Sequence, residues 1–431
     1  MAGDRVPATS AVTSPLVERL FRAEAGHLVA YFTRRLGPGR LALAEDIVQD
    51  ALIVALQQWP FSGVPDQPGA WLRRVATNRA IDLLRRQVRF DARAARLARA
   101  IEEDRRAAVV DSTTRQPDWA DDELRMVMMC CHPALPRGAR VALSLKAVSG
   151  FSVAEIARAL LADERAIAQR LVRAKRLIRA HRIRFVLPAG RALVPRVDSA
   201  LDVIYLLFNE GYTAHAGDNL VRADLCREAL RLGRLIAGTR EVATPRSHAL
   251  VALMALHAAR IPARLNAAGE LVRLEDQDRR TWDMSLNSLG FQHLEQSMQA
   301  SCESAFHLQA AIAATHAAAP DGTATDWTTI LALYDRLVLL TPTPVVRLNR
   351  AVALARVAGP AEGLAALAAV DRAGSLARYY LLPAVRAELL AEAGQAKEAA
   401  RAYREALKRQ CSEPERRFLQ SRLDALARRS A

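Results

Sequence analysis

The chain has 431 residues, and its 61 lysines and arginines against 46 aspartates and glutamates give a formal net charge of +15. Hydrophobic residues make up 51% and aromatic residues only 5%, so aliphatic side chains must build the cores, which favours helices over sheets. This composition excludes a disordered chain, a collagen-like chain and a small disulfide-stapled domain. Residues 1–190 hold 31 basic and 20 acidic side chains, a bias that favours a polyanion such as nucleic acid as the partner of this half.

The sequence carries no signal for export or for membrane insertion. An odd number of cysteines, five, is spread over the long chain, which suits reduced thiols in a cytoplasm. Residues 1–15 lack the apolar stretch of a signal peptide. The longest uncharged stretch, residues 304–320, holds two histidines and a glutamine and is not expected to span a bilayer. We therefore expect a soluble cytoplasmic protein with no membrane partner.

The first predicted elements are helices over residues 16–59, with a break at residues 37–39 (GPG). The second of these helices has one apolar face, and its other face is acidic and amide-rich, with Glu45, Asp46, Gln49 and Asp50. Residues 60–69 have turn chemistry throughout, and a long basic helix is predicted over residues 70–89. An acidic and amide face of this kind suits docking on a basic partner.

Residues 152–179 predict two short helices joined by a tight connector. Ser152 and Glu155 form a capping box at the first helix, and Asp163 caps the second. The second helix has an apolar stripe that faces inward and a basic stripe that faces outward. The apolar stripe is Ile167, Leu171, Ala174 and Ile178, and the basic stripe is Arg165, Gln169, Arg173 and Arg176. A helix-turn-helix needs this pattern, because its basic helix enters the major groove, where arginine reads guanine or grips phosphate. An ordinary helical hairpin with a solvated arginine face is the alternative.

Two sets of motifs in the first half resemble one known family. Residues 44–50 (AEDIVQD) and 68–86 (PGAWLRRVATNRAIDLLRR) resemble region 2 of sigma-70-type factors of the extracytoplasmic-function class. Residues 143–179, notably IAQRLVRAKR at 167–176, resemble region 4 of the same factors. The order agrees as well, since a tether stands between them in place of region 3. The two sets together are far more specific than either alone.

The resemblance implies a protein that joins core RNA polymerase, recognises the −35 and −10 promoter elements and helps to open DNA. Asp46, Gln49 and Asp50 would bind the β′ clamp helices of core polymerase, and the β subunit is a further expected partner. The expected −10 contacts, where a flipped base must be held, are Trp71, Arg74, Asn78, Arg79, Asp82, Arg85 and Arg86. The expected −35 contacts are Arg165, Gln169, Arg170, Arg173, Lys175 and Arg176. Trp71 also fits a core position, and Asp82 also fits a surface partner of nearby arginines.

Cys130-Cys131-His132-Pro133 resembles a metal motif only superficially. Adjacent cysteines lack the usual ligand spacing, and no second pair of ligands is evident. The alternative is a helix that packs its thiols inward and ends near Pro133. No Walker loop, nucleophile elbow or HExxH motif occurs in the sequence. We therefore expect no metal, no cofactor and no enzyme activity.

Beyond Pro188 and Pro195 every segment has a helical pattern. Gly394, Ala399, Tyr403 and Ala406 have the spacing of a tetratricopeptide repeat, and Gly359 stands one period earlier. Residues 201–212, and 275–279 with Trp282, resemble the long all-helical extension of a subgroup of these sigma factors. The resemblance implies a regulatory extension that stands in for a separate anti-sigma factor, and an unknown ligand or protein is its expected partner.

The sequence thus predicts an all-α fold. Its parts are a region 2 helical bundle (1–90), a flexible linker (91–122), a region 4 helix-turn-helix (123–185), a helical extension module (186–300) and tetratricopeptide-like repeats (301–431). The predicted function is that of an alternative sigma factor. Two alternatives stay open. A helix-turn-helix regulator with a helical sensor domain leaves residues 44–89 unexplained, and a helical scaffold makes the basic face incidental.

Overall fold

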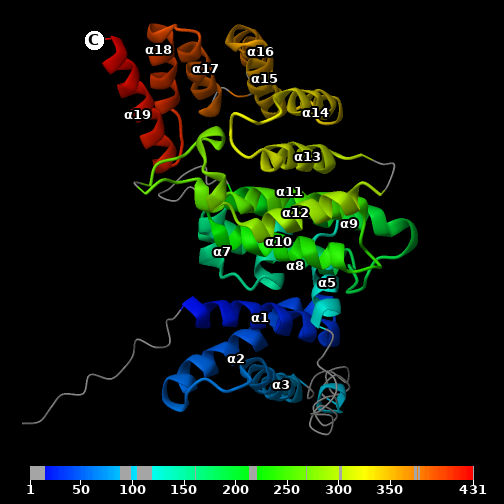
Figure 1. Cartoon of the computed structure of the whole chain (residues 1–431). Coiled ribbons are helices and arrows are strands. Elements are labelled where there is room, and N and C mark those ends of the chain that lie inside the picture. The colour runs from blue at the N-terminus through cyan, green and yellow to red at the C-terminus, as the bar shows by residue number, and fades with distance from the viewer. Residues whose placement is uncertain are drawn as a thin grey trace, which may run out of the picture. The chain divides into compact units, whose positions relative to one another are not determined.

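The computed structural model describes residues 15–87, 99–103, 119–160, 162–212, 221–267, 269–299, 303–372, 376 and 379–430. Over these residues every regular element is helical, and a single isolated bridge pairs Leu265 with Leu271. The prediction of an all-α fold is therefore confirmed. The chain divides into two compact units, residues 1–203 and 204–431, and Figure 1 labels their helices in chain order. Most of the predicted linker, residues 91–122, lies outside the described residues.

The first three helices of unit 1 pack together. They are α1 (Pro15–Leu36), α2 (Leu41–Ser62) and α3 (Pro68–Gln87). The predicted break between the first two is confirmed, because Gly37 has a φ of 89° and a short 3-10 turn, η1 (Pro38–Arg40), leads into α2. Their shared core is mainly aliphatic with a few aromatic rings, and it includes Leu28, Phe32, Ile47, Ala51, Trp59, Leu72 and Leu84.

The predicted turn over residues 60–69 is shorter than expected. Helix α2 continues through Pro60 to Ser62, and α3 already begins at Pro68. Proline has no N–H to donate, yet the backbone N–H of Gly63 still donates to the carbonyl of Trp59 at 3.0 Å and closes the last turn. Burial of Trp59 against Trp71, with ring centroids 5.4 Å apart, holds this turn in place.

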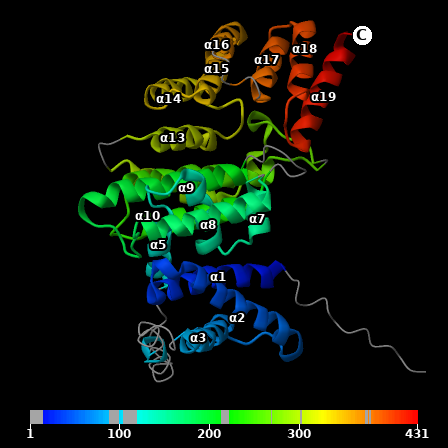
Figure 2. The same ribbon diagram turned by 180° about the vertical axis from the view of Figure 1, so that it is seen from behind.

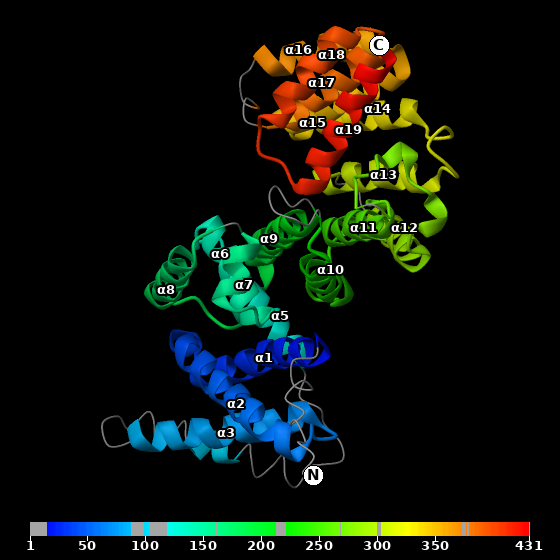
Figure 3. The ribbon, with the colours of Figure 1, turned by 90° about the vertical axis from the view of Figure 1, so that its left-hand side faces the viewer.

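The rest of unit 1 contains α5 (Trp119–Cys130), α6 (Arg137–Leu143), a π-helical turn η2 (Ser144–Val148), α7 (Val153–Ala159) and α8 (Glu164–Ala180). Figure 3 shows α5 to α8 grouped together. Helix α1 packs directly on η2, where a Cβ at Gly26 would lie 1.9 Å from the carbonyl oxygen of Val148. Only glycine permits this approach.

Unit 1 includes the start of helix α9 (Leu193–Tyr212). Arg196 donates from Nη2 to the carbonyl of Met128 at 2.7 Å, and the Ser199 hydroxyl donates to the carbonyl of Cys131 at 2.5 Å. These two bonds attach α9 to α5. The compact unit therefore continues past residue 185, where the sequence analysis begins its extension module.

Unit 2 is a series of helices in which each packs on the next. They are α10 (Ala223–Gly238), α11 (Pro245–Ala259), α12 (Met284–Ser297), α13 (Ala305–Ala318), α14 (Trp327–Leu340), α15 (Pro344–Ala358), α16 (Pro360–Arg372), α17 (Leu381–Glu392), α18 (Ala396–Leu407) and α19 (Glu413–Ser430). Helix α11 is buried along almost its whole length. A long connection, residues 260–283, joins α11 to α12 through three 3-10 turns, η4 (Ile261–Ala263), η5 (Leu274–Asp276) and η6 (Arg279–Thr281).

Two helical hairpins, α15–α16 and α17–α18, stand side by side and are followed by α19 (Figure 2). Gly359 and Gly394 occupy the turn of the first and second hairpin, with φ values of 98° and 77°. Residues with a Cβ rarely adopt this conformation, which explains why glycine recurs at this spacing. Ala399, Tyr403 and Ala406 are buried in α18. The small and aromatic positions seen in the sequence are thus packing positions of stacked hairpins.

Candidate nucleic-acid interface

The predicted polymerase-binding residues lie on α2, on the face away from the core. Asp46 and Gln49 are exposed. Asp50 is half-buried, and its Oδ2 accepts a hydrogen bond from Nε of Arg79 on α3 at 2.6 Å. The structure thus joins a residue predicted for polymerase binding to one predicted for the −10 element. Because the charge of Asp50 is compensated within the protein, Asp46 and Gln49 are the more available members of this set.

Two apolar residues extend this face of α2, and the sequence analysis missed both. Ile53 is 43% exposed and Leu56 is 47% exposed. With Asp46 and Gln49 they follow the spacing i, i+3, i+7 and i+10, so all four share one stripe of the helix. We call these four residues the α2 stripe. Exposed apolar side chains beside an acidic residue are typical of a docking surface for a protein partner. The helical spacing could have revealed them.

The predicted −10 residues follow α3. Arg74, Asn78, Asp82, Arg85 and Arg86 are exposed, and the first four are spaced along one side of the helix. Trp71 is half-buried and lies against Trp59. Trp71 therefore packs with part of its ring and keeps another part accessible, which is compatible with both roles that the sequence left open.

The last turn of α2 carries an aromatic side chain that the sequence analysis did not single out. Phe61, at the end of α2, is 92% exposed, and Val64, three residues after it, is about half exposed. A phenylalanine without packing partners has no part in the core, and aromatic faces stack on unpaired bases. Phe61 and Val64 therefore belong with the −10 residues as candidate contacts.

The helix-turn-helix geometry predicted for residues 152–179 is confirmed. The backbone N–H of Ser152 donates to Oε2 of Glu155 at 2.7 Å, and the N–H of Glu155 donates to the Ser152 hydroxyl at 3.1 Å. Asp163 accepts from the N–H groups of Arg165 and Ala166 at 2.9 and 3.2 Å and so caps α8. The predicted inward stripe is buried throughout: Ile167, Leu171, Ala174 and Ile178.

The six residues predicted for the −35 element divide into two groups. The exposed group is Arg165, Gln169, Arg173 and Arg176. The half-buried group is Arg170, which lies against Gly138 of α6, and Lys175, whose ammonium donates to Oε2 of Glu45 on α2. Next to Lys175, Arg179 donates from Nε and Nη2 to the carbonyl of Gly39 at 3.3 and 3.0 Å. One flank of α8 therefore contacts the region that begins α2, and the other presents four polar side chains.

Cys130 and Cys131 are both buried at the end of α5, as the inward-packing interpretation requires. Burial raises the pKa of the Cys131 thiol to about 11, and burial also raises the pKa of Cys130. Burial lowers the pKa of His132 to about 4, and its Nδ1 accepts from the N–H of Ala134 at 3.1 Å. Metal ligation needs thiolates, so this environment disfavours it. Within the described ranges, no three His, Cys, Asp or Glu side chains are grouped as metal ligands.

None of the helices among the described residues combines the length and the apolar character that crossing a membrane requires.

Comparison with known proteins matches three parts of the chain to families. Residues 20–90 match sigma-70 region 2, and residues 125–178 match sigma-70 region 4. Residues 196–298 match a family of unknown function, DUF6596. An uncharacterized protein of Rhizobium meliloti (strain 1021), R00370, is 40% identical over 403 residues, which cover 93% of either chain. No solved structure matches the chain.

Proposed function

The chain belongs to the sigma-70-type factors of the extracytoplasmic-function class, with a helical extension after region 4, and we propose that it binds core RNA polymerase through the α2 stripe. Sigma factors are not enzymes; they act in transcription initiation in the cytoplasm by bringing polymerase to promoters. The observation that carries the proposal is that Asp46, Gln49, Ile53 and Leu56 are exposed on one side of α2. The β′ clamp helices are the partner of this stripe, and the β subunit is a further contact.

The −10 element is assigned to α3 and the loop before it. Arg74, Arg85 and Arg86 supply phosphate contacts, and Asn78 has both donors and an acceptor for a base edge. Opening the strands requires an unstacked base to be held, at a cost of a few kcal/mol. Phe61 and the accessible part of Trp71 provide aromatic faces that recover part of this cost by stacking.

The −35 element is assigned to the exposed stripe of α8. Arg165, Gln169, Arg173 and Arg176 stand on the side of α8 away from its buried stripe. A basic helix of this width enters the major groove, where arginine pairs with two acceptors of guanine.

Both elements can be bound together only if α8 leaves α2. The elements are named for positions −35 and −10, so their centres lie about 25 base pairs apart, which is roughly 85 Å along B-form DNA. The ion pair between Lys175 and Glu45, in contrast, puts α8 directly on α2. The chain between α3 and α5, residues 88–118, can reach at most roughly 100 Å and therefore allows the separation. We expect this ion pair to break when the factor binds a promoter.

Reconstitution tests the proposal directly. The purified protein is mixed with core RNA polymerase and a template that carries a candidate promoter, and promoter-specific transcripts are measured. Transcription that requires both the protein and the promoter elements supports the proposal. If the protein instead binds a duplex operator as a dimer and never associates with core polymerase, the proposal is wrong.

We also propose that the extension regulates the sigma part, by shifting it between competent and incompetent arrangements. The test is to remove the extension and to compare transcription with that of the full chain. The bonds of Arg196 and Ser199 to α5 mean that a truncation after Arg184 also damages unit 1. A truncation after Tyr212 keeps α9 whole. Equal activity of this folded variant and the full chain under all conditions would refute regulation by the extension.

A further inference from the structure

Unit 2 contains a cavity of about 280 Å³ between the α11–α12 connection and four of the helices that follow it. The connection contributes Arg273, Leu274, Glu275 and Arg279, and the walls are completed from α13, α14, α15 and α17. The sequence analysis singled out residues 275–279 as a motif, and the sigma function assigns no role to them. Because Glu275 and Arg279 line a cavity, ligand binding is a role that fits them.

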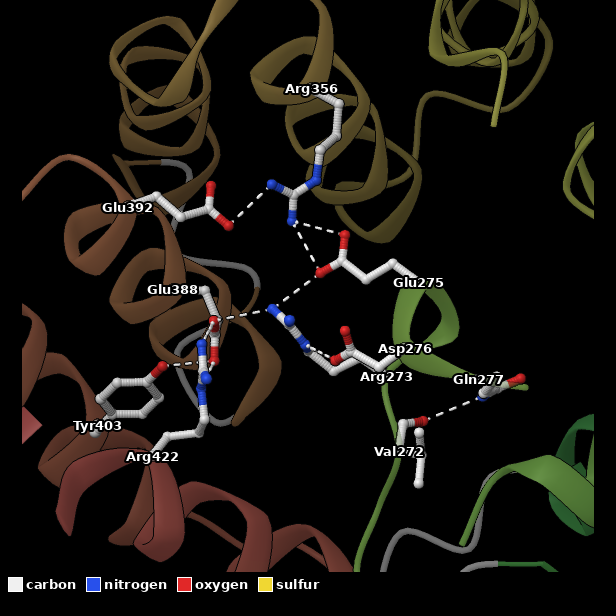
Figure 4. Close-up of polar contacts among 10 residues, drawn as sticks. All are labelled: Val272, Arg273, Glu275, Asp276, Gln277, Arg356, Glu388, Glu392, Tyr403 and Arg422. Atoms are coloured by element: carbon white, nitrogen blue, oxygen red, sulfur yellow. Dashed lines mark hydrogen bonds and ion pairs between the residues drawn. The ribbon is translucent and has the colours of Figure 1, made fainter. Parts of the chain in front are cut away.

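A network of ion pairs fixes the rim of this cavity (Figure 4). Arg273 bridges Glu275 at 2.9 Å, Asp276 at 2.7 Å and Glu388 of α17 at 3.2 Å. Glu388 also accepts from Arg422 at 2.6 Å and from the Tyr403 hydroxyl at 2.5 Å. Burial opposes the ionisation of Glu388, but the bonds from Arg422 and Tyr403 and the charge of Arg273 outweigh it, so the pKa of Glu388 lies below its ordinary value. Glu388 is therefore ionised, and the carboxylates of the rim are already paired.

The cationic side chains of the wall retain unused donors. Arg356 donates to Glu392 at 2.9 Å and to Glu275 at 3.2 Å, yet its buried Nε has no partner among the described residues. Arg279 donates to the carbonyls of His316 and Ala319 and to the Thr325 hydroxyl, and its buried Nε likewise has none. A buried donor without a partner costs about 1–3 kcal/mol. Two such donors in the wall of one cavity indicate a site that an acceptor completes.

The other walls are aromatic and apolar. The ring of Trp327 stands edge-on to His316 at a centroid distance of 5.2 Å. Burial lowers the pKa of His316 to about 3 and raises the pKa of Tyr334 to about 12, so both rings are neutral at pH 7. Val352 and Leu389 add aliphatic surface. On α15, Asn349, Val352 and Arg356 share one side at the spacing i, i+3 and i+7, which puts an amide, an apolar group and a cation in line along the cavity.

Charge and size select the class of ligand. Among the described residues Arg273 and Arg356 are paired with carboxylates, whereas Arg279 bonds only carbonyls and a hydroxyl, so the lining keeps one uncompensated positive charge. A single negative charge balances it, whereas a phosphate group of nearly two charges would meet the carboxylates of Glu275 and Glu388. A 150 Å³ cavity holds one benzene molecule, so a 280 Å³ cavity holds a ligand of about ten non-hydrogen atoms. Neutral aromatic walls favour a flat apolar body.

We propose that this cavity is a binding site for a monocarboxylate with an aromatic or aliphatic body. The carboxylate pairs with Arg279 and Arg356 and with the amide of Asn349, and the body packs against Trp327, Tyr334 and Val352. The same chemistry is offered by a free small acid and by the C-terminal carboxylate of a polypeptide that ends in an apolar residue. The site lies wholly within unit 2 and does not depend on promoter recognition.

The experiment uses the full-length protein and phenylacetate, which has the expected size and a single charge. Phenylacetamide, of the same shape without the charge, is the matched control ligand. Binding is followed by calorimetry and by tryptophan fluorescence, since Trp327 lines the cavity. We expect saturable binding of the acid that is at least about tenfold tighter than that of the amide. A hexapeptide ending in phenylalanine, with a free or an amidated C-terminus, distinguishes a polypeptide terminus from a small acid.

Two variants test whether the ligand binds in this cavity. Arg356→Gln removes one of the two proposed cations, and Val352→Trp fills the space but keeps every charge, so each should lower the affinity at least about tenfold. Arg350→Gln is the matched control, because Arg350 lies on the same helix but bonds Asp335, at 2.5 Å, outside the cavity lining. Circular dichroism melting confirms that each variant is folded. The proposal is wrong if neither the acid nor the free peptide terminus binds at up to about 10 mM. It is also wrong if the neutral forms bind as well as the acids, or if both cavity variants bind like the natural protein.

Discussion

The two units of the chain place their polar side chains in opposite ways. In unit 1 the candidate functional residues, such as Asp46, Asn78 and Arg173, are exposed on single helices at helical spacing. In unit 2 the charged residues around the cavity, such as Arg273 and Glu388, are half-buried and come from elements more than a hundred residues apart in sequence. A large partner such as polymerase or DNA needs a continuous outer surface. A small ligand needs groups that converge from several elements.

This difference predicts where substitutions act. A change on an outer stripe of unit 1 should alter binding and leave the free energy of unfolding nearly constant, because the side chain loses few contacts. A change inside unit 2 should alter stability as well. The four experiments below test this contrast, from the largest expected effect to the smallest.

Reversing the α2 stripe should have the largest effect. Asp46→Arg with Gln49→Arg places two cations against a basic partner, and we expect core polymerase binding to weaken by at least about a hundredfold. Asp50 is left unchanged because its bond to Arg79 supports the packing of α2 on α3. Gln58→Arg, on the same helix but outside the stripe, is the matched control. Normal co-purification of the double variant with core polymerase would show that this surface is not used.

Truncating one side chain of α8 should weaken promoter binding. Arg173→Ala should cost about 1–3 kcal/mol at promoters with the preferred −35 sequence if the guanidinium pairs with a base. If it contacts phosphate, the loss should be similar for all sequences and the salt dependence should become shallower. Arg137→Ala, exposed on α6, controls for the loss of charge. An unaltered promoter preference together with an unaltered salt slope would assign Arg173 to solvent.

Acid should destabilise unit 2 through its buried histidines. Burial, together with the charges of Arg260 and Arg264 and with His316, lowers the pKa of His257 to about 3. The folded state therefore holds this ring neutral, while the unfolded chain takes up a proton near pH 6.5. Its contribution to stability is complete above pH 6.5 and is lost progressively as the pH falls towards 3. Between pH 7 and pH 5 we expect a loss of about 2 kcal/mol from this residue.

Urea unfolding of the full-length protein at the two pH values measures this loss. His257→Leu removes the titrating group, so its stability should change less between pH 7 and pH 5 than that of the natural protein. Equal pH dependence of the two proteins would show that His257 is not held neutral in the fold.

Breaking the contact between α8 and α2 should have the smallest effect on free energy. The side chains of Lys175 and Glu45 are 23% and 12% exposed, so the ion pair is partly shielded from water. Glu45→Lys should favour separation of the two helices by about 1 kcal/mol, and the exchange Glu45→Lys with Lys175→Glu should restore the contact. Energy transfer between dyes attached to α3 and α8 measures the separation. If the single variant and the exchange give the same distance as the natural protein, the pair does not hold α8 on α2.

Local sequence was enough for the parts of unit 1 that a single helix defines. The capping of α7 by Ser152 and of α8 by Asp163, and the buried stripe that begins at Ile167, depend on residues within about one turn to four turns of one another. Side-chain direction along a helix follows directly from spacing. For the same reason the exposed position of Arg173 and Arg176 was predictable, and Ile53 and Leu56 could have been assigned to the α2 stripe from their spacing alone.

Contacts between distant segments lay beyond that reasoning. The pairing of Asp50 with Arg79, of Lys175 with Glu45 and of Arg196 with the carbonyl of Met128 joins helices whose relative orientation no local pattern specifies. The cavity of unit 2 is the extreme case, because residues 273–279 become a wall only where the α11–α12 connection meets the hairpin stack. The sequence by itself determined the helices, their caps and their exposed faces, because these depend on interactions within a few turns. Only the tertiary structure decided which charges are paired and where a cavity remains, because both depend on how whole helices pack.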